Sequence, residues 1–203
     1  MDKLYLSYTN QYYRMDQKLL AESILNQIDL NAEERERFFS FVKEKKVKKK
    51  QFLLLEGDIS RYVLFVVSGC LRSYCVDENG YQYIQQFAPE GWWIGDMYSL
   101  VTGQPGHLAV DAVFDSEIAM IAKADLNKLY KEIPQLNIYF RVLAENALVY
   151  YQSRAMENLR LTAKERYERF CTRYPSLIAC LPQKQVAAYI GVTPEFLSKM
   201  LNQ

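Results

Sequence analysis

Side chains that could catalyse a reaction are scarce in this sequence of 203 residues. It has one histidine, His107, so a Ser/His/Asp triad, a Cys/His pair or the several His/Glu metal ligands of a cupin-like enzyme would all depend on that residue. The cysteines lack CxxC spacing, and we expect small buried or half-buried thiols of a reduced compartment: Cys70, Cys75, Cys171 and Cys180. We therefore predict that the protein is not an enzyme and holds no metal or other cofactor.

The last 21 residues, "QKQVAAYIGVTPEFLSKMLNQ" (183–203), have the spacing of a helix-turn-helix. Counting from residue 183, apolar residues stand at positions 4, 8, 10, 15 and 18: Val186, Ile190, Val192, Leu197 and Met200. Ala187 lets two crossed helices approach, and Gly191 supplies the positive φ that turns the chain. Thr193 is a favoured N-cap and Pro194 a favoured first helical residue. The pattern predicts a reader of double-stranded DNA; an unrelated pair of core helices is the alternative.

Polar side chains at the start of the second helix could contact the DNA. Glu195 can accept a hydrogen bond from a cytosine amino group, and Lys199 can reach guanine or a phosphate. The predicted DNA-binding residues are Thr193, Pro194, Glu195, Ser198 and Lys199, with Gln183 at the start of the first helix. Residues 154–203 hold eight Lys/Arg against four acids, a charge of +4, whereas the rest of the chain sums to −3. A basic terminal part is compatible with a polyanionic partner.

The elements that must position these residues fall into three regions. Residues 17–45 have helical periodicity, and the run of lysines at 43–50 is interpreted as a solvated helix end that leads into a strand. For residues 51–122 the pattern predicts short strands with close turns, including a hairpin at Asn79-Gly80. Such an arrangement indicates a β-sandwich or a small β-barrel. From residue 123 on, the residue pattern again predicts helices.

A long helix without Gly or Pro is predicted for residues 135–160. Its apolar stripe recurs at three- and four-residue spacing: Leu136, Phe140, Leu143, Ala147 and Tyr150. Such a stripe needs a partner surface, which is either the body of the same chain or a second copy of the helix. We predict a homodimer through residues 135–160.

From about residue 20 to 203, the chain resembles the Crp/Fnr superfamily of bacterial transcription regulators. The stretches that carry the resemblance are "LLLEGD", "LFVVSGCLRSY", "GWWIGD" and "LPQKQVAAYIGVTPEFLSKML". The resemblance implies an α+β fold: a double-stranded β-helix (jelly-roll) sensor domain of cyclic-nucleotide-binding type, a dimerisation helix and a helix-turn-helix that binds palindromic DNA, with RNA polymerase as a further partner. The corresponding boundaries are 1–16 for an N-terminal arm, 17–134, 135–160 and 161–203.

The sequence departs from the cyclic-AMP-binding members of that family. They hold the cyclic phosphate with a Gly-Glu pair and an Arg-Ser pair, where this chain has Gly95-Asp96 and Gly106-His107. Without the arginine a buried phosphate loses its strongest partner, so we expect no cyclic AMP binding. The predicted effector pocket, for an unknown small molecule if any, contains Gly95, Asp96, Met97 and His107. Iron–sulfur sensors of the family carry a cluster of cysteines near the amino terminus, which this sequence lacks. The sequence also shows no segment for the β-hairpin, called a wing, that follows the recognition helix in family members.

The remaining expectations concern location and an alternative function. No apolar run approaches the ~18 residues of a membrane span, and no signal peptide is evident, which predicts a cytoplasmic protein without membrane contact. The alternative function is a ligand-sensing module whose terminal helices contact a protein rather than DNA. Binding to a duplex pool that falls with salt would favour the DNA reader.

Overall fold

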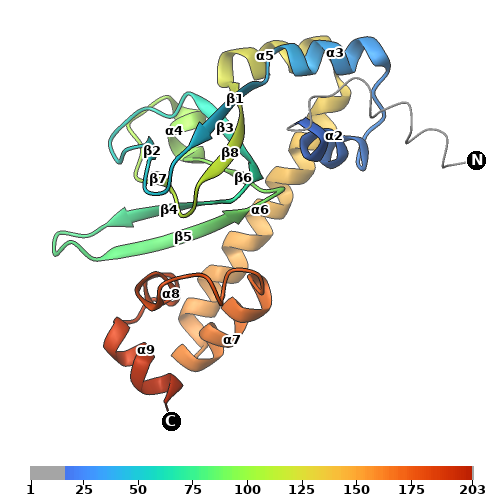
Figure 1. Cartoon of the computed structure of the whole chain (residues 1–203). Helices are drawn as coiled ribbons and strands as arrows, with labels where there is room; N and C mark the ends of the chain where they lie inside the picture. Colours follow the sequence, from blue (N-terminus) through green and yellow to red (C-terminus); the bar gives the residue numbers. More distant parts are fainter. Residues whose placement is uncertain (1–16, 203) are drawn as a thin grey trace, which may run out of the picture. The chain divides into compact units, whose positions relative to one another are not determined.

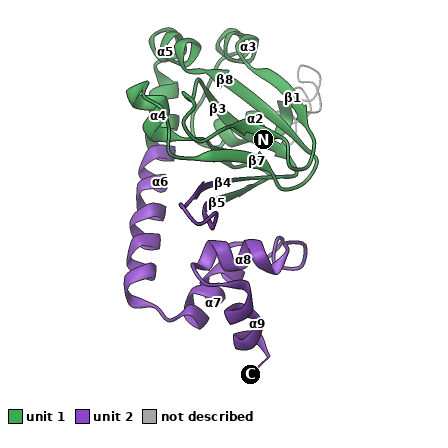
Figure 2. Cartoon of the chain, turned by 90° about the vertical axis from the view of Figure 1, so that its left-hand side faces the viewer, with its two compact units in different colours: residues 1–73, 87–141 green, residues 74–86, 142–203 purple. Residues whose placement is uncertain are grey.

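The computed structural model describes residues 17–202 (Figure 1). The chain forms two compact units (Figure 2): unit 1 runs up to Ser73 and from Phe87 to Arg141, and unit 2 comprises Tyr74–Gln86 and the chain from Val142 on. The predicted arm at residues 1–16 lies outside the described residues. Among the described helices, none is both long and apolar enough to cross a membrane.

Unit 1 begins with two short helices, α2 (Lys18–Leu25) and α3 (Ala32–Ser40). A capping box starts α3: the Glu34 amide donates to the Asn31 side chain and the Asn31 amide to the Glu34 carboxylate, both at 2.9 Å. The predicted helices before residue 41 are confirmed, but the lysine run is not a helix end. Residues Lys43–Val47 form strand β1, which pairs on one side with β8. Exposed lysines suit such an edge strand because their charge discourages pairing with other chains.

The strands form the two sheets of the predicted roll. The further strands are β2 (Phe52–Leu54), β3 (Tyr62–Ser68), β4 (Cys70–Val76), β5 (Gln82–Pro89), β6 (Trp93–Ile94), β7 (Ala109–Ala112) and β8 (Ser116–Ala122). Their orders are β1-β8-β3-β6 and β2-β7-β4-β5. The pairs β1–β8, β3–β8, β3–β6 and β2–β7 are antiparallel. Inward residues of both sheets make one apolar core: Val47, Leu64, Val66, Leu71, Ala88, Ile94, Val110, Ala112 and Ile118. The jelly-roll prediction is confirmed.

A buried ion pair joins neighbouring strands β4 and β7. The Arg72 guanidinium donates to both carboxylate oxygens of Asp111 at 2.7 and 2.8 Å, and both side chains are almost fully buried. The two-point geometry supplies the hydrogen bonds that a buried charge requires.

The hairpin between β4 and β5 turns at Asn79-Gly80, as predicted. Gly80 has a φ of 80°, and the Asp77 carboxylate accepts the amides of Asn79 and Tyr81 at 2.9 Å each. These backbone donors, chiefly that of Tyr81, lower the pKa of Asp77. The aspartate therefore fixes the turn in its ionised form.

Further helices complete the fold. They are α4 (Met97–Thr102), α5 (Lys123–Glu132), α6 (Gln135–Arg160), α7 (Ala163–Arg173), α8 (Gln183–Ile190) and α9 (Pro194–Leu201). Those after residue 122 follow the sequence prediction, whereas α4 lies within the region predicted as strands only. Within unit 1, α3 and α5 lie side by side (Figures 1 and 2), joined by the Arg37–Glu132 ion pair at 2.7 Å. The uninterrupted helix predicted for 135–160 is confirmed.

Candidate nucleic-acid interface

Helices α8 and α9 pack as a helix-turn-helix within unit 2. Val186, Ile190 and Leu197 are buried between them, and Ala187 is fully covered. Val192 and Met200, the other two apolar positions of the pattern, are half-buried. The helix pair predicted from spacing is thereby confirmed.

The turn between the helices has the predicted chemistry. Gly191 ends α8 with a φ of 74°, and its amide donates to the Ala187 carbonyl at 2.9 Å. Thr193 then caps α9, since its hydroxyl accepts the Phe196 amide at 3.2 Å. The cap and the glycine together set where α9 begins.

Helix α7 holds the end of α8 in place. The Arg166 guanidinium donates to the carbonyls of Ile190 and Leu161, each at 2.8 Å. The Ile190 carbonyl is one of those that a helix end leaves without an intrahelical partner, so Arg166 both satisfies it and joins the two helices.

A cluster of tyrosines joins α6 to the helix-turn-helix inside unit 2. The Tyr150 hydroxyl lies 3.3 Å from that of Tyr174 and 3.2 Å from that of Tyr189, and it donates to the Gln85 carbonyl at 3.1 Å. Arg154 lies 3.7 Å from the centre of the Tyr189 ring and donates to the Tyr189 carbonyl. Burial raises the pKa of Tyr150 well above its usual value, so the network consists of neutral hydroxyls.

The predicted reading side chains are accessible to different degrees. Thr193, Glu195 and Lys199 are exposed, as is Gln183 on α8, whereas Pro194 and Ser198 are half-buried. A further side chain, Phe196, is 52% exposed on the first turn of α9. The sequence prediction did not include it, although its place between Glu195 and the buried Leu197 already put it outside the apolar pattern.

The basic residues of this region divide into two groups. Arg154, Arg166 and Arg173 are used within the fold, the last in a pair with Glu157 at 3.2 Å. Lys184 on α8 and Lys199 on α9 are exposed and make no hydrogen bond or ion pair with any described residue. The exposed cations, which also include Arg160, Lys164 and Arg169, are the ones available to a phosphate.

Helix α6 presents a different apolar face from the predicted stripe. Leu136 is fully buried in its own chain, the Phe140 ring packs on Trp93 with centroids 5.4 Å apart, and Tyr150 belongs to the tyrosine cluster. Leu143 is half-buried and Ala147 exposed. The large apolar side chains that α6 exposes are a separate set: Ile138, Leu148, Val149, Met156 and Leu159.

The predicted effector residues surround a buried carboxylate. Asp96 is 2% exposed and caps α4 by accepting the Ser99 amide at 2.9 Å. Its other oxygen accepts the amides of His107 and Leu108 at 2.8 and 3.0 Å. A Cβ on Gly106 would lie 2.5 Å from that oxygen, which excludes an arginine there without rearrangement. Gly95 borders the cavity described next; Met97 is exposed, and the His107 ring lies 4.8 Å from that of Tyr98.

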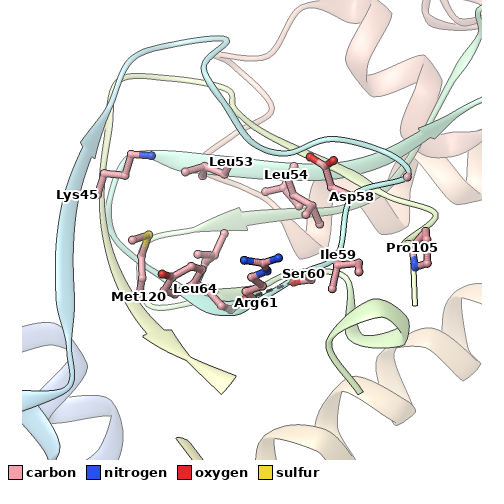
Figure 3. Close-up of a pocket in the computed structure, with 14 residues that line it drawn as sticks. Lys45, Leu53, Leu54, Asp58, Ile59, Ser60, Arg61, Leu64, Pro105 and Met120 are labelled. Atoms are coloured by element: carbon pink, nitrogen blue, oxygen red, sulfur yellow. Dashed lines mark hydrogen bonds between the residues drawn. The ribbon is translucent and has the colours of Figure 1, made fainter. Parts of the chain in front are cut away.

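A cavity of about 600 Å³ opens in unit 1 beside Gly95 (Figure 3). Its apolar lining comes from both sheets and the loop before β3, and its charged lining side chains are Lys45, Asp58 and Arg61. Of the predicted effector residues only Gly95 is among the described lining residues. Sequence reasoning missed the charged ones because nothing in their spacing brings β1 and the residues before β3 together.

Together, the units define a class of protein: a sensor-type β-roll connected through a long helix to a helix-turn-helix. Comparison with known proteins identifies this class more closely. Residues 44–132 match the family model of the cyclic nucleotide-binding domain.

Two curated relatives extend the match along the chain. The probable transcriptional regulator flp of Lacticaseibacillus casei is 24% identical over 186 residues, covering 86% of this chain and 82% of that protein. The fumarate and nitrate reduction regulatory protein of Vibrio cholerae is 24% identical over the same share of this chain and 74% of its own. FixK2 from Bradyrhizobium japonicum has the same fold, with a TM-score of 0.70 at 23% identity over 80% of this chain and 83% of that one. Along most of its length the chain is therefore similar to transcriptional regulators, as the resemblance to the Crp/Fnr superfamily implies.

Proposed function

We propose that this protein regulates transcription by binding palindromic promoter DNA as a homodimer, with α9 in the major groove. The main support is the helix pair: its apolar positions are buried or half-buried, while the first turns of α9 leave Glu195, Phe196 and Lys199 exposed. In a helix-turn-helix these turns contact base edges. A small-molecule effector and RNA polymerase are the further partners expected of such a regulator.

Each exposed group of α9 has a distinct role in this proposal. Glu195 accepts from a cytosine amino group, and Lys199, four residues later on the same helix face, binds guanine or a phosphate. Phe196 contacts a thymine methyl group. The Thr193 oxygen already accepts an amide, so its hydroxyl hydrogen remains available to a phosphate. At the start of α8, Gln183 and Lys184 bind the DNA backbone.

The exposed apolar face of α6 pairs with a second copy of the same helix. Val149 and Met156 are seven residues apart, which is about two helical turns, so they lie on the same side of α6. Leu148 and Leu159 are eleven residues apart, which is about three turns, so these two also lie on the same side. Surface of this kind is normally covered by a partner. A two-fold dimer is the arrangement that matches an inverted repeat in DNA.

The proposal is tested with duplexes selected from the source genome and with scrambled duplexes, across a salt series. Glu195→Ala should relax the preference at one base pair by roughly 1–3 kcal/mol without weakening non-specific binding. Lys199→Ala should weaken binding, and if its partner is a phosphate the salt slope should fall by about one per subunit.

Matched controls are Glu168→Ala on α7 and Lys131→Ala on α5, both exposed, which should behave like the parent protein. If Glu195→Ala and Lys199→Ala equal the parent on both duplexes, α9 does not read DNA. The alternative, in which the terminal helices bind a protein, then takes its place.

A further inference from the structure

The cavity of unit 1 combines an apolar lining with an excess of positive charge. Its apolar residues are Leu53, Leu54, Ile59, Leu64, Val110 and Met120. Lys45 and Arg61 carry positive charge and Asp58 negative charge, so the lining sums to +1. In Figure 3 the guanidinium of Arg61 lies near the middle of the lining side chains, and the amine of Lys45 points inward from β1. A volume of about 600 Å³ is typical of small-molecule sites.

Three backbone amides of α4 and the loop after it are not free to hold an anion. Those of Ser99, His107 and Leu108 already donate to the Asp96 carboxylate, which is an anion built into the protein. In contrast, the side chains of Arg61 and Lys45 make no hydrogen bond or ion pair with any described residue. These two cations are therefore available to a ligand.

The backbone that carries Arg61 is held from both sides. Its carbonyl accepts the Lys123 amide at 2.9 Å, and the preceding Ser60 amide donates to the Ser99 hydroxyl at 2.8 Å. The loop above it is fixed to the loop after α4: the Gly57 amide donates to the Gly106 carbonyl at 3.0 Å, and the Gly106 amide to the Asp58 carbonyl at 2.9 Å. The backbone that carries the Arg61 side chain therefore needs little reorganisation when a ligand binds.

We propose that this cavity binds a small organic acid with one negative charge. The hydrocarbon or aromatic body would lie against Leu54, Leu64 and Met120, and the carboxylate would bind the Arg61 guanidinium, with Lys45 as the second cation. The apolar lining favours such a body, and the net charge of +1 matches one anion, since Asp58 disfavours a second. The inference rests on the proposed function in treating unit 1 as the sensor, but the binding step itself requires no DNA.

The test uses two fluorescent probes with the same rings. 8-Anilinonaphthalene-1-sulfonate carries one negative charge, and N-phenyl-1-naphthylamine carries none. Arg61→Gln should weaken binding of the anionic probe about tenfold, as expected for loss of one charge-assisted hydrogen bond, and leave the neutral probe unchanged. Arg61→Lys should restore part of the affinity, and the exposed Lys131→Gln on α5 should have no effect.

Methyl resonances of the methionines show where the probe binds. The Met120 methyl lines the cavity, whereas Met156 is exposed on α6 and reports binding to that apolar face instead. At a concentration that half-saturates the parent protein, the anionic probe should shift Met120 clearly in the parent and much less in Arg61→Gln. Equal affinities of parent and Arg61→Gln, or a shift at Met156 without one at Met120, would overturn the proposal. Neither result bears on DNA binding by α9, which is measured separately, so failure of this inference and failure of the proposed function are distinguishable.

Discussion

Replacing Asp96 by alanine should destabilise unit 1 through a small set of hydrogen bonds. The carboxylate caps α4 through the Ser99 amide and holds the following loop through the amides of His107 and Leu108, at 2.8–3.0 Å. The side chain is 2% exposed, so water cannot readily replace it. All three donors would be left without their acceptor in Asp96→Ala.

The size of the effect follows from these contacts. Loss of an N-cap costs about 0.5–2 kcal/mol and each buried donor left unpaired about 1–3 kcal/mol, so we expect a loss of about 3–5 kcal/mol once partial relaxation is allowed for. Asp96→Asn keeps one acceptor oxygen and should lose about half as much.

Urea unfolding followed by tryptophan fluorescence measures this loss in the right unit, because the two tryptophans, Trp92 and Trp93, both belong to unit 1. Asp29→Ala, an exposed acid in the same unit, is the control and should change the free energy of unfolding by less than about 0.5 kcal/mol. If Asp96→Ala unfolds within about 1 kcal/mol of the parent, the three hydrogen bonds do not hold the loop as described.

Other predictions follow from single sites. Leu148→Lys should convert the proposed dimer into a monomer by light scattering, because it places a charge on the exposed face of α6. Phe196→Ala should lower affinity for a selected duplex more than for a scrambled one in the binding assay. Cyclic AMP should show no micromolar binding by calorimetry, since Asp96 already occupies the loop amides. Burial raises the pKa of Cys70 to about 12, so at pH 8 it stays a thiol and should react with a thiol reagent far more slowly than exposed Cys180.

The parts of the fold that sequence predicts well are those set by local chemistry. Gly191 and Thr193 determine the turn before α9 whatever surrounds them, and Asn79-Gly80 determines a hairpin in the same way. Residues 135–160 lack any helix breaker, so their helix could be predicted to the residue. The lysine-rich strand β1 could not, because its structure comes from pairing with β8 rather than from its own propensity.

Which face of a helix or strand is buried was harder to predict than the helix or strand itself. Helix α6 is apolar on more than one side, so periodicity alone could not separate Leu136, buried in its own chain, from exposed Leu159. Of the cavity cations, Lys45 comes from β1 and Arg61 from the loop before β3, and they have no common spacing. Tyr150 joins residues far apart in the chain, Gln85 and Tyr189, which only the folded structure brings together.

The most direct test of the account is footprinting of the protein on genomic fragments that it selects. Two copies of α9 related by a two-fold axis should protect two half-sites in inverted repeat, about 10 base pairs apart centre to centre, on one side of the duplex. Affinity should fall steeply as salt rises. Failure to enrich any fragment, or protection of a single site without inverted symmetry by a protein that is monomeric in solution, would contradict a dimeric regulator that reads DNA through α9.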